Sequence, residues 1–192
     1  MQKKKLIVAL TGASGATYAV RLINYLAGRK DIEVSLIVSD TARMVVPHET
    51  DLTAEMLSKK CKMTFPFNDL SAPLASGSFK RDGMIVIPCT IKTMSSIAYS
   101  LSNNLIVRAA DVNLKEKKPL VLCVRETPLH VGHLKTMTRL AEMGAVIMPL
   151  SPSFYHRPKT IDEIVDFTVG RALDLMGIEN ELSHPYEGIK QK

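Results

Sequence analysis

Five short segments of the chain are apolar throughout and do not alternate with polar residues. They lie at residues 6–10, 34–38, 84–87, 120–124 and 145–148. A strand that helices cover on both faces of a parallel sheet has this continuous apolar pattern. We therefore predict five strands that belong to one buried sheet.

Segments with helical spacing separate these strands. Ala19, Leu22, Ile23 and Leu26 repeat at intervals of three and four residues, and Gly28 is placed to end that helix. Further helical signal lies at residues 94–101, 103–117, 129–143 and 161–176. Strands that alternate with crossover helices predict an α/β fold, an open doubly wound parallel sheet with helices on both faces.

Cap residues place the ends of two of these helices. Thr160 and Glu163 have the spacing of a capping box, and Gly177 is placed to close the same helix. Thr127 and Pro128 are predicted to be the cap and the first-turn residue of the helix within 129–143.

The length of 192 residues suits one domain, which we place at residues 1–178, with a polar C-terminal tail at 179–192. Residues 49–83 have the weakest pattern and are predicted to hold a helix and an irregular excursion. No segment approaches the roughly 20 apolar residues of a membrane span, so none is predicted. Three cysteines without C-x-x-C spacing argue against a disulfide framework and favour the reducing cytoplasm.

A formal net charge of +6 raises the question of nucleic-acid binding. The lysines are dispersed, however, and aromatic residues make up 5% of the chain with no tryptophan, so no stacking platform accompanies them. A cationic cleft for a phosphorylated ligand fits this charge better.

In an open parallel sheet the ligand site lies beyond the carboxyl ends of the strands. The first strand runs into Thr-Gly-Ala-Ser-Gly-Ala at 11–16, where Gly12, Ala13 and Ser14 would let a ligand approach backbone amides at a helix start. This turn lacks the G-x-G-x-x-G pattern of dinucleotide sites, and it also lacks the G-x-S-x-G elbow of serine hydrolases.

The next two strand ends carry hydroxyls and a cation. Ser39 follows the second strand, and Thr90, Lys92 and Thr93 follow the third, a composition that suits a phosphate. Each residue also has a simpler interpretation, because Ser39 and Thr93 could only cap helices and Lys92 could be solvated.

The last two strand ends add more charge. Arg125 and Glu126 follow the fourth strand, where they could bind an anion and move protons or form only a surface ion pair. After the fifth strand, Tyr155, His156 and Arg157 fall within one loop that suits an organic phosphate, although His156 could equally have no chemical role.

Four other polar residues on predicted helices are weaker candidates. Arg108 is predicted to pair with Asp111, and Arg171 would suit a phosphate if the last helix lines the site. His130 and His133 have the spacing of a metal pair, but no nearby carboxylate completes a ligand set, so no metal is predicted.

Taken together, these segments resemble the flavin prenyltransferases, the UbiX family, within the flavodoxin-like homo-oligomeric flavoproteins. The matching pieces span nearly the whole chain. They are Thr-Gly-Ala-Ser-Gly-Ala at 11–16, Ala-Ser-Gly-Ser-Phe at 75–79, Ile-Pro-Cys-Thr-Ile-Lys-Thr at 87–93, Arg-Ala-Ala-Asp-Val at 108–112, Leu-Lys-Glu-Lys-Lys-Pro-Leu at 114–120, Arg-Glu-Thr-Pro-Leu at 125–129 and Phe-Tyr-His-Arg-Pro at 154–158. One departure is Cys-Thr at 89–90, where relatives often have Cys-Ser, and it keeps the hydroxyl.

The resemblance implies metal-independent transfer of a dimethylallyl group from dimethylallyl phosphate to N5 and C6 of reduced FMN. The prenylated FMN would serve a UbiD-type decarboxylase. The residues that the resemblance assigns to FMN are Gly12, Ala13, Ser14, Ser39, Thr90, Ile91, Lys92, Thr93 and Arg125.

The resemblance also assigns the chemistry. Tyr155 and Arg171 would hold the dimethylallyl phosphate, and Ser14 and Lys115 would join them at the departing phosphate. Glu49 and Glu126 would manage protons. The family implies a dodecamer in which Lys115 and Glu126 act on the ligand of a neighbouring chain.

Three rival functions stay open at this point. A flavin-dependent cysteine decarboxylase would carry Pro-x-Met-Asn-x-x-Met-Trp, and this chain has no tryptophan. An aromatic acid decarboxylase subunit would release carbon dioxide unaided. A flavodoxin-like electron carrier would need no second phosphate pocket. The sequence does not decide between monophosphate and diphosphate donors, nor which decarboxylase receives the product.

Overall fold

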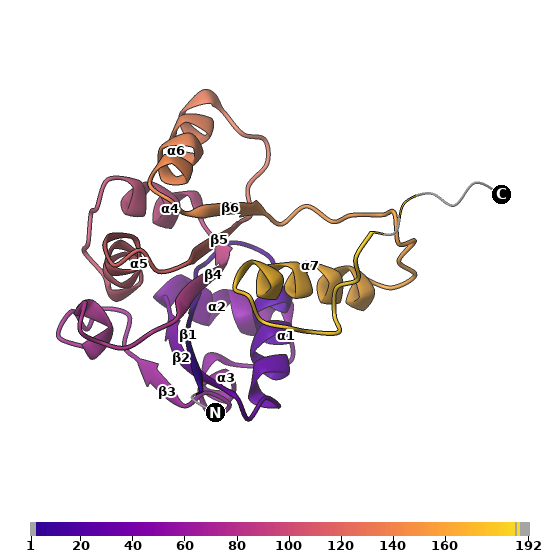
Figure 1. Ribbon diagram of the computed structural model, residues 1–192, viewed down its shortest axis with the longest axis horizontal. Coiled ribbons are helices and arrows are strands. Elements are labelled where there is room, and N and C mark those ends of the chain that lie inside the picture. Colours follow the sequence, from indigo (N-terminus) through magenta and orange to yellow (C-terminus); the bar gives the residue numbers. More distant parts are fainter. Residues whose placement is uncertain (1–2, 187, 189–192) are drawn as a thin grey trace.

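The computed structural model describes residues 3–186 and residue 188, and in that part of the chain a six-stranded parallel sheet forms the centre (Figure 1). The strand order is β3-β2-β1-β4-β5-β6. The strands are β1 (Lys4–Leu10), β2 (Ile32–Val38), β3 (Met63–Phe65), β4 (Gly83–Cys89), β5 (Leu120–Val124) and β6 (Val146–Pro149). The doubly wound parallel sheet predicted from the apolar pattern is thus confirmed.

Helices cover both faces of the sheet. They are α1 (Ala16–Ala27), α2 (Asp40–Glu49), α3 (Ala54–Ser58), α4 (Ile91–Ala98), α5 (Leu105–Lys115), α6 (Val131–Glu142) and α7 (Ile161–Leu175), with a 3-10 turn η1 (Pro73–Ala75). Two separate buried clusters show how the layers form. One contains α1, α2, α3 and α7 with one face of the sheet, and the other contains η1, α4, α5 and α6 with the opposite face.

Side-chain alternation explains why the strands are apolar throughout. In β1, Leu6, Val8 and Leu10 belong to one cluster, whereas Ile7 and Ala9 belong to the other. Every residue of such a strand faces a helix layer, so polar substitution is disfavoured on either side.

The predicted strands agree closely with the observed ones, and the fourth, 120–124, agrees at both ends. The strand that sequence reasoning missed is β3, which lies at the sheet edge within residues 49–83. It is three residues long, and Met63 and Thr64 are exposed. A strand this short and this exposed has no continuous apolar run to reveal it.

The ends of α7 confirm the cap predictions. The Glu163 amide donates to Thr160 Oγ1 at 3.2 Å, and Gly177 follows the helix with a φ of 60°. The predicted start of α6 was wrong, because the helix begins at Val131 and its cap is His130, whose Nδ1 accepts the Gly132 amide at 3.0 Å.

The segment after α7 returns along that helix. The Asn180 side chain donates to the Gly170 carbonyl at 3.3 Å and to Asp174 at 2.8 Å, and Leu182 packs against the core. Residues 180–183 are therefore held in place, whereas residues 187 and 189–192 of the predicted tail lie outside the described residues. None of the helices that the structure describes has the length and apolar character to cross a membrane.

Candidate active site

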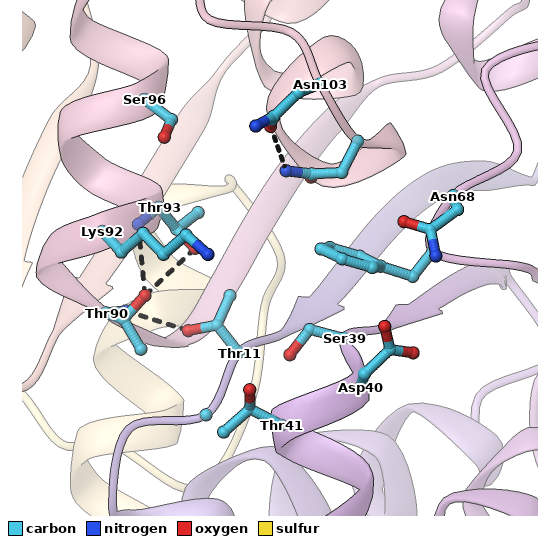
Figure 2. A pocket seen from close by; sticks show the side chains of 13 residues that line it. Thr11, Ser39, Asp40, Thr41, Asn68, Thr90, Lys92, Thr93, Ser96 and Asn103 are labelled. Carbon is cyan, nitrogen blue, oxygen red and sulfur yellow. Dashed lines mark hydrogen bonds between the residues drawn. The ribbon is translucent and has the colours of Figure 1, made fainter.

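A pocket of about 360 Å³ lies beyond the carboxyl ends of β1, β2, β3 and β4 (Figure 2). The strand order reverses between β1 and β4, and ligands of doubly wound sheets bind at such a switch point. The predicted residues that line this pocket are Gly12, Ser39, Thr90, Lys92 and Thr93.

Three helices begin at this pocket. Their caps, Ser39 of α2, Thr90 of α4 and Asn104 of α5, each accept a hydrogen bond from the amide three residues further along, at 3.2, 3.2 and 3.1 Å. The positive ends of three helix dipoles therefore converge, and Lys92 adds a full charge. This arrangement can bind an anion such as a phosphate.

The caps also answer two alternatives that the sequence left open. Ser39 does cap a helix, and it lines the pocket as well. The cap of α4 is Thr90 and not Thr93, whose hydroxyl accepts a hydrogen bond from Thr90 Oγ1 at 3.0 Å.

Thr11 joins two of the turns that form the pocket, and sequence reasoning missed it. Its hydroxyl donates to the Pro88 carbonyl at 2.7 Å and accepts the Thr90 amide at 2.9 Å. The side chain is 3% exposed, so water does not compete for these groups. Thr11 therefore fixes the turn after β4 relative to the turn after β1.

The backbone after β1 lies directly against α2. A Cβ atom added at Gly12 would come within 2.2 Å of Thr41 Cγ2, a distance that real structures do not show. Only glycine allows this close approach, which brings the first and second strand ends to one pocket.

A second cluster surrounds the carboxylate of Glu49. Its Oε2 accepts the amides of Gly15 and Ala16, both at 2.8 Å. Partial burial alone would raise the pKa of Glu49, but hydrogen bonds from Ser14 and these two amides, with the charge of Arg125, hold the pKa below its usual value. The expectation that these amides are open to a ligand is thereby corrected, because Glu49 occupies the start of α1.

Arg125 lies close enough to this cluster for its charge to act on Glu49. Its amide donates to the Cys89 carbonyl at 3.2 Å, which fixes the backbone after β5 to the turn after β4. Its Nε is buried without a hydrogen-bond partner among the described residues. A buried donor of this kind calls for an acceptor, and a bound ligand can supply one.

A third cluster lies between the β6–α7 loop and α7. The Tyr155 ring meets Phe167 edge-on with centroids 5.6 Å apart, and the His156 ring stacks on Phe167 at 4.5 Å. Arg171 is one turn beyond Phe167 on the same face of α7 and donates to Asp174 at 2.7 Å. Tyr155 and Arg171 therefore belong to one region, but neither lines the strand-end pocket.

Other predicted residues also lie outside that pocket. Ala13 is buried after β1, and Ile91, the first residue of α4, packs against the core. Glu126 is exposed and accepts the Thr127 amide at 3.1 Å.

Lys115 lies at the opposite side of the sheet, near the amino ends of the strands. It ends α5, whose cap is at the pocket, and an 11-residue helix spans about 16 Å. A single chain therefore does not bring Lys115 to the pocket.

Sequence reasoning missed eight residues that line the pocket. They are Thr11, Asp40, Thr41, Phe67, Asn68, Ser96, Asn103 and Asn104. Phe67 and Asn68 follow β3, so they were missed with that strand. Asn104 could have been found, because an asparagine before a helical stripe is a cap signal.

The histidines considered as a metal pair have another role. His130 caps α6, and its ring lies 3.5 Å from that of His133 between centroids. Within the described residues no group of three or more His, Cys, Asp or Glu side chains could hold a metal ion.

A doubly wound parallel sheet with an anion site at its switch point defines a nucleotide- or flavin-binding protein of the α/β class. The Flavoprotein family model matches residues 1–173, which places the chain among the flavoproteins. Among curated proteins, the flavin prenyltransferase UbiX of Escherichia coli K12 is 50% identical over 91% of this chain and 93% of its own length. The UbiX of Archaeoglobus fulgidus is also 50% identical, over 91% of this chain and 96% of its own length.

Solved structures agree with these relatives. AnUbiX (PadA1) in complex with FMN and dimethylallyl pyrophosphate superposes with a TM-score of 0.95 and 38% identity, covering 98% of this chain and all of that one. A dodecameric FMN-dependent UbiX-like decarboxylase from Escherichia coli O157:H7 has a TM-score of 0.94 and 40% identity, covering 96% and 100%. The chain belongs to the UbiX family of flavin prenyltransferases.

Proposed function

We propose that this chain joins the dimethylallyl group of dimethylallyl phosphate to reduced FMN, giving prenylated FMN for a UbiD-type decarboxylase. The bond between the allyl carbon and the phosphate oxygen breaks, and inorganic phosphate leaves. N5 and C6 of the flavin each lose a proton as they form a bond to carbon, and one proton adds to the allyl double bond as the ring closes. The observation that carries this proposal is the likeness, over 98% of the chain, to a structure that holds FMN together with dimethylallyl pyrophosphate.

In this proposal the strand-end pocket holds FMN. The residues that would hold it are Gly12, Ala13, Ser14, Ser39, Thr90, Ile91, Lys92, Thr93 and Arg125. Support comes from the three helix starts around Lys92, which suit the phosphate of FMN, and from the unpartnered Nε of Arg125, which can donate to a flavin acceptor.

The donor would bind where the β6–α7 loop meets α7. The Tyr155 phenol and the Arg171 guanidinium would hold its phosphate, and Ser14 and Lys115 would add donors as the negative charge on the leaving group grows. Preorganised donors of this kind lower a barrier because they need no reorganisation during the reaction.

Two carboxylates would manage protons. The lowered pKa of Glu49 keeps it ionised near neutral pH, so it is an acceptor next to Ser14. Glu126, exposed beside Arg125, would act at a site shared with a neighbouring chain.

The position of Lys115 supports a homo-oligomer, because α5 places Lys115 away from the pocket of its own chain. We propose a dodecamer, as in the Escherichia coli relative named above. We also propose that residues 1–178 form the FMN-binding domain, followed by the tail at 179–192, and that the protein works in the cytoplasm, where its three free cysteines stay reduced.

The direct test is to mix purified protein with reduced FMN and dimethylallyl phosphate without oxygen, and then to measure the mass of the flavin. A gain of one five-carbon isoprenoid unit supports the proposal, and an unchanged flavin mass rejects it. Running dimethylallyl pyrophosphate in parallel identifies the donor that the chain prefers.

A decarboxylase remains the second candidate, because two similar structures carry that name, the Escherichia coli protein above and the phenylacrylic acid decarboxylase of Aquifex aeolicus. Carbon dioxide released from an aromatic acid by the purified protein alone would favour it. The likeness to cysteine decarboxylases, at 13% identity for TvaF, and to the redox cage DmrB, at 15%, concerns the fold alone.

A further inference from the structure

A groove of about 370 Å³ lies at the amino ends of the strands, opposite the strand-end pocket. Its cations are Lys3, Lys5, Lys80, Arg81 and Lys118, and its carboxylates are Asp82 and Glu116. Lys115, which the proposed function places at the departing phosphate, pairs with Glu116 at the rim of this groove.

Arg81 differs from the other cations of the groove because it is only 4% exposed. Its guanidinium donates to the carbonyls of Phe79 at 3.1 Å, of Leu74 at 3.4 Å and of Ser76. Burial lowers the pKa of Arg81, with the charge of Glu116 acting in the opposite direction. A buried cation is costly, so its full set of carbonyl partners strongly constrains residues 74–79.

A second arginine holds the same loop. Arg108 Nε donates to the Ala75 carbonyl at 3.1 Å, and its Nη1 pairs with Asp111 at the same distance. Four backbone carbonyls between residues 74 and 79 therefore accept hydrogen bonds from these two arginines, and they belong to Leu74, Ala75, Ser76 and Phe79.

The loop in turn touches the Lys115–Glu116 pair. A Cβ atom added at Gly77 would come within 2.3 Å of Glu116 Oε1 and 2.8 Å of Lys115 Nζ. The hydrogen bond and charge of Lys115, followed by the charges of Arg81 and Lys118, lower the pKa of Glu116. Arg81, the loop and the carboxylate of Glu116 thus form one support for the ammonium of Lys115.

We infer that Arg81 is a positioning residue: it fixes the 74–79 loop and Glu116, and through them the ammonium of Lys115 that completes the phosphate site of a neighbouring subunit. The inference rests on the proposed function and deepens it. It assigns to each chain a supporting face at the amino ends of its strands, separate from the pocket that binds FMN.

Arg81→Met removes every donor and keeps much of the side-chain length, whereas Arg81→Lys keeps the charge with fewer donors. We expect kcat for prenyl transfer to fall between about 10-fold and 100-fold in Arg81→Met, because misplacing a group by an ångström has an effect of this size. FMN affinity should stay close to that of the unchanged protein, and Arg81→Lys should recover part of the rate.

Two matched variants separate this role from general damage. Gly77→Ala leaves Arg81 in place but pushes against the ends of Lys115 and Glu116, so it should lower kcat in the same way. Lys3→Met removes a cation from the same groove that pairs with Glu33 at 3.7 Å and does not touch the loop, so it should leave the rate unchanged.

Mixed oligomers give the decisive readout. Arg81→Met chains co-assembled with Tyr155→Phe chains should be more active than either parent, because some sites combine an intact face from one chain with an intact pocket from the other. Arg81→Met mixed with Lys115→Ala should show no such gain, since both changes damage the same face. General misfolding of the Arg81→Met chain would not follow this pattern.

Two results would overturn the inference, provided that the wild-type protein transfers the prenyl group. One is an unchanged kcat in Arg81→Met, and the other is rescue of Arg81→Met by Lys115→Ala chains but not by Tyr155→Phe chains. Absence of transfer in the wild type would instead overturn the proposed function, and the inference with it. If Arg81→Met does not assemble, Arg81→Lys and Gly77→Ala can each replace it in the mixing test, and the same outcomes support or overturn the inference.

Discussion

At the scale of single residues, the strand-end pocket and the neighbouring Glu49 cluster depend on polar groups that each hold at least two partners. Thr11 bonds to two turns at once, and Glu49 accepts two amides and the Ser14 hydroxyl. Removing such a group leaves its partners unsatisfied, which costs more than the net value of the hydrogen bond.

Thr11→Val keeps the shape of the side chain and loses both hydrogen bonds. We expect a loss of about 1–3 kcal/mol in the free energy of unfolding and weaker FMN binding, because the Thr90 turn is released. Thermal unfolding and fluorescence titration with FMN measure both. Thr11→Ser keeps the hydroxyl and should retain both the stability and the FMN affinity of the wild type. Equal behaviour of the two variants would show that the hydroxyl is unimportant.

Tyr155 and Arg171 lie outside the strand-end pocket that we propose for FMN, so their variants should separate FMN binding from prenyl transfer. Tyr155→Phe and Arg171→Ala are each expected to impair prenyl transfer and to leave FMN bound, as measured by flavin mass and by flavin absorbance after gel filtration. Loss of flavin in both variants would contradict this division of the site.

Glu49 predicts a particular dependence of stability on pH. Its folded-state pKa is lowered, so its stabilising contribution is present above the unfolded value of about 4.3 and is lost as the pH falls through the folded value. Because the carboxylate is largely exposed, we expect Glu49→Gln to cost no more than about 1 kcal/mol at pH 7. Thermal melts from pH 7 to pH 3 should show the difference from wild type shrinking in acid, and a constant difference would refute this role.

At the scale of elements, the site is built from helix starts and not from helix faces. Three capped helix starts meet at the pocket, and Figure 2 shows the cap side chains of Ser39 and Thr90 among the residues that line it. The opposite end of α5 carries Lys115 to the other edge of the sheet, so one helix links the pocket to the groove.

Asn104 offers a test of the cap and of the dipole together. Asn104→Ala should cost about 1 kcal/mol of stability because α5 loses its cap. Asn104→Asp keeps the cap and faces the pocket with a negative charge, so it should retain stability and weaken FMN binding. Unfolding experiments and FMN titrations distinguish the two variants. Equal FMN affinity in Asn104→Asp and in the wild type would show that the start of α5 does not contribute to the anion site.

At the scale of the whole molecule, a single chain separates three groups that the reaction would need together. The strand-end pocket, the Tyr155 region and Lys115 lie on different parts of the fold, and Figure 1 shows the β6–α7 connection extending away from the sheet. An assembly of several copies can bring such groups together at one site.

Assembly should therefore control activity. Sedimentation is expected to show particles many times heavier than the 21.2 kDa chain. Conditions that dissociate them should abolish prenyl transfer before they abolish the fold, because the pocket lies within one chain and Lys115 does not reach it. Full activity in a monomer fraction would contradict the proposal.

The amino-acid sequence by itself determined the sheet class, most strand positions and the strand-end residues of the pocket, such as Ser39, Thr90 and Lys92. These follow from local physics: buried strands must be apolar, and helix starts need caps. The sequence also placed both ends of α7, since Thr160 and Gly177 act on their own neighbours.

Tertiary structure alone decided the features that depend on distant partners. Thr11 meets Thr90 from 79 positions away, and Glu49 occupies the amides of Gly15 and Ala16 across more than 30 positions. The short edge strand β3 forms only because β2 offers it hydrogen bonds. No local pattern encodes such pairings, because their free energy arises only when the folded sheet brings the partners together.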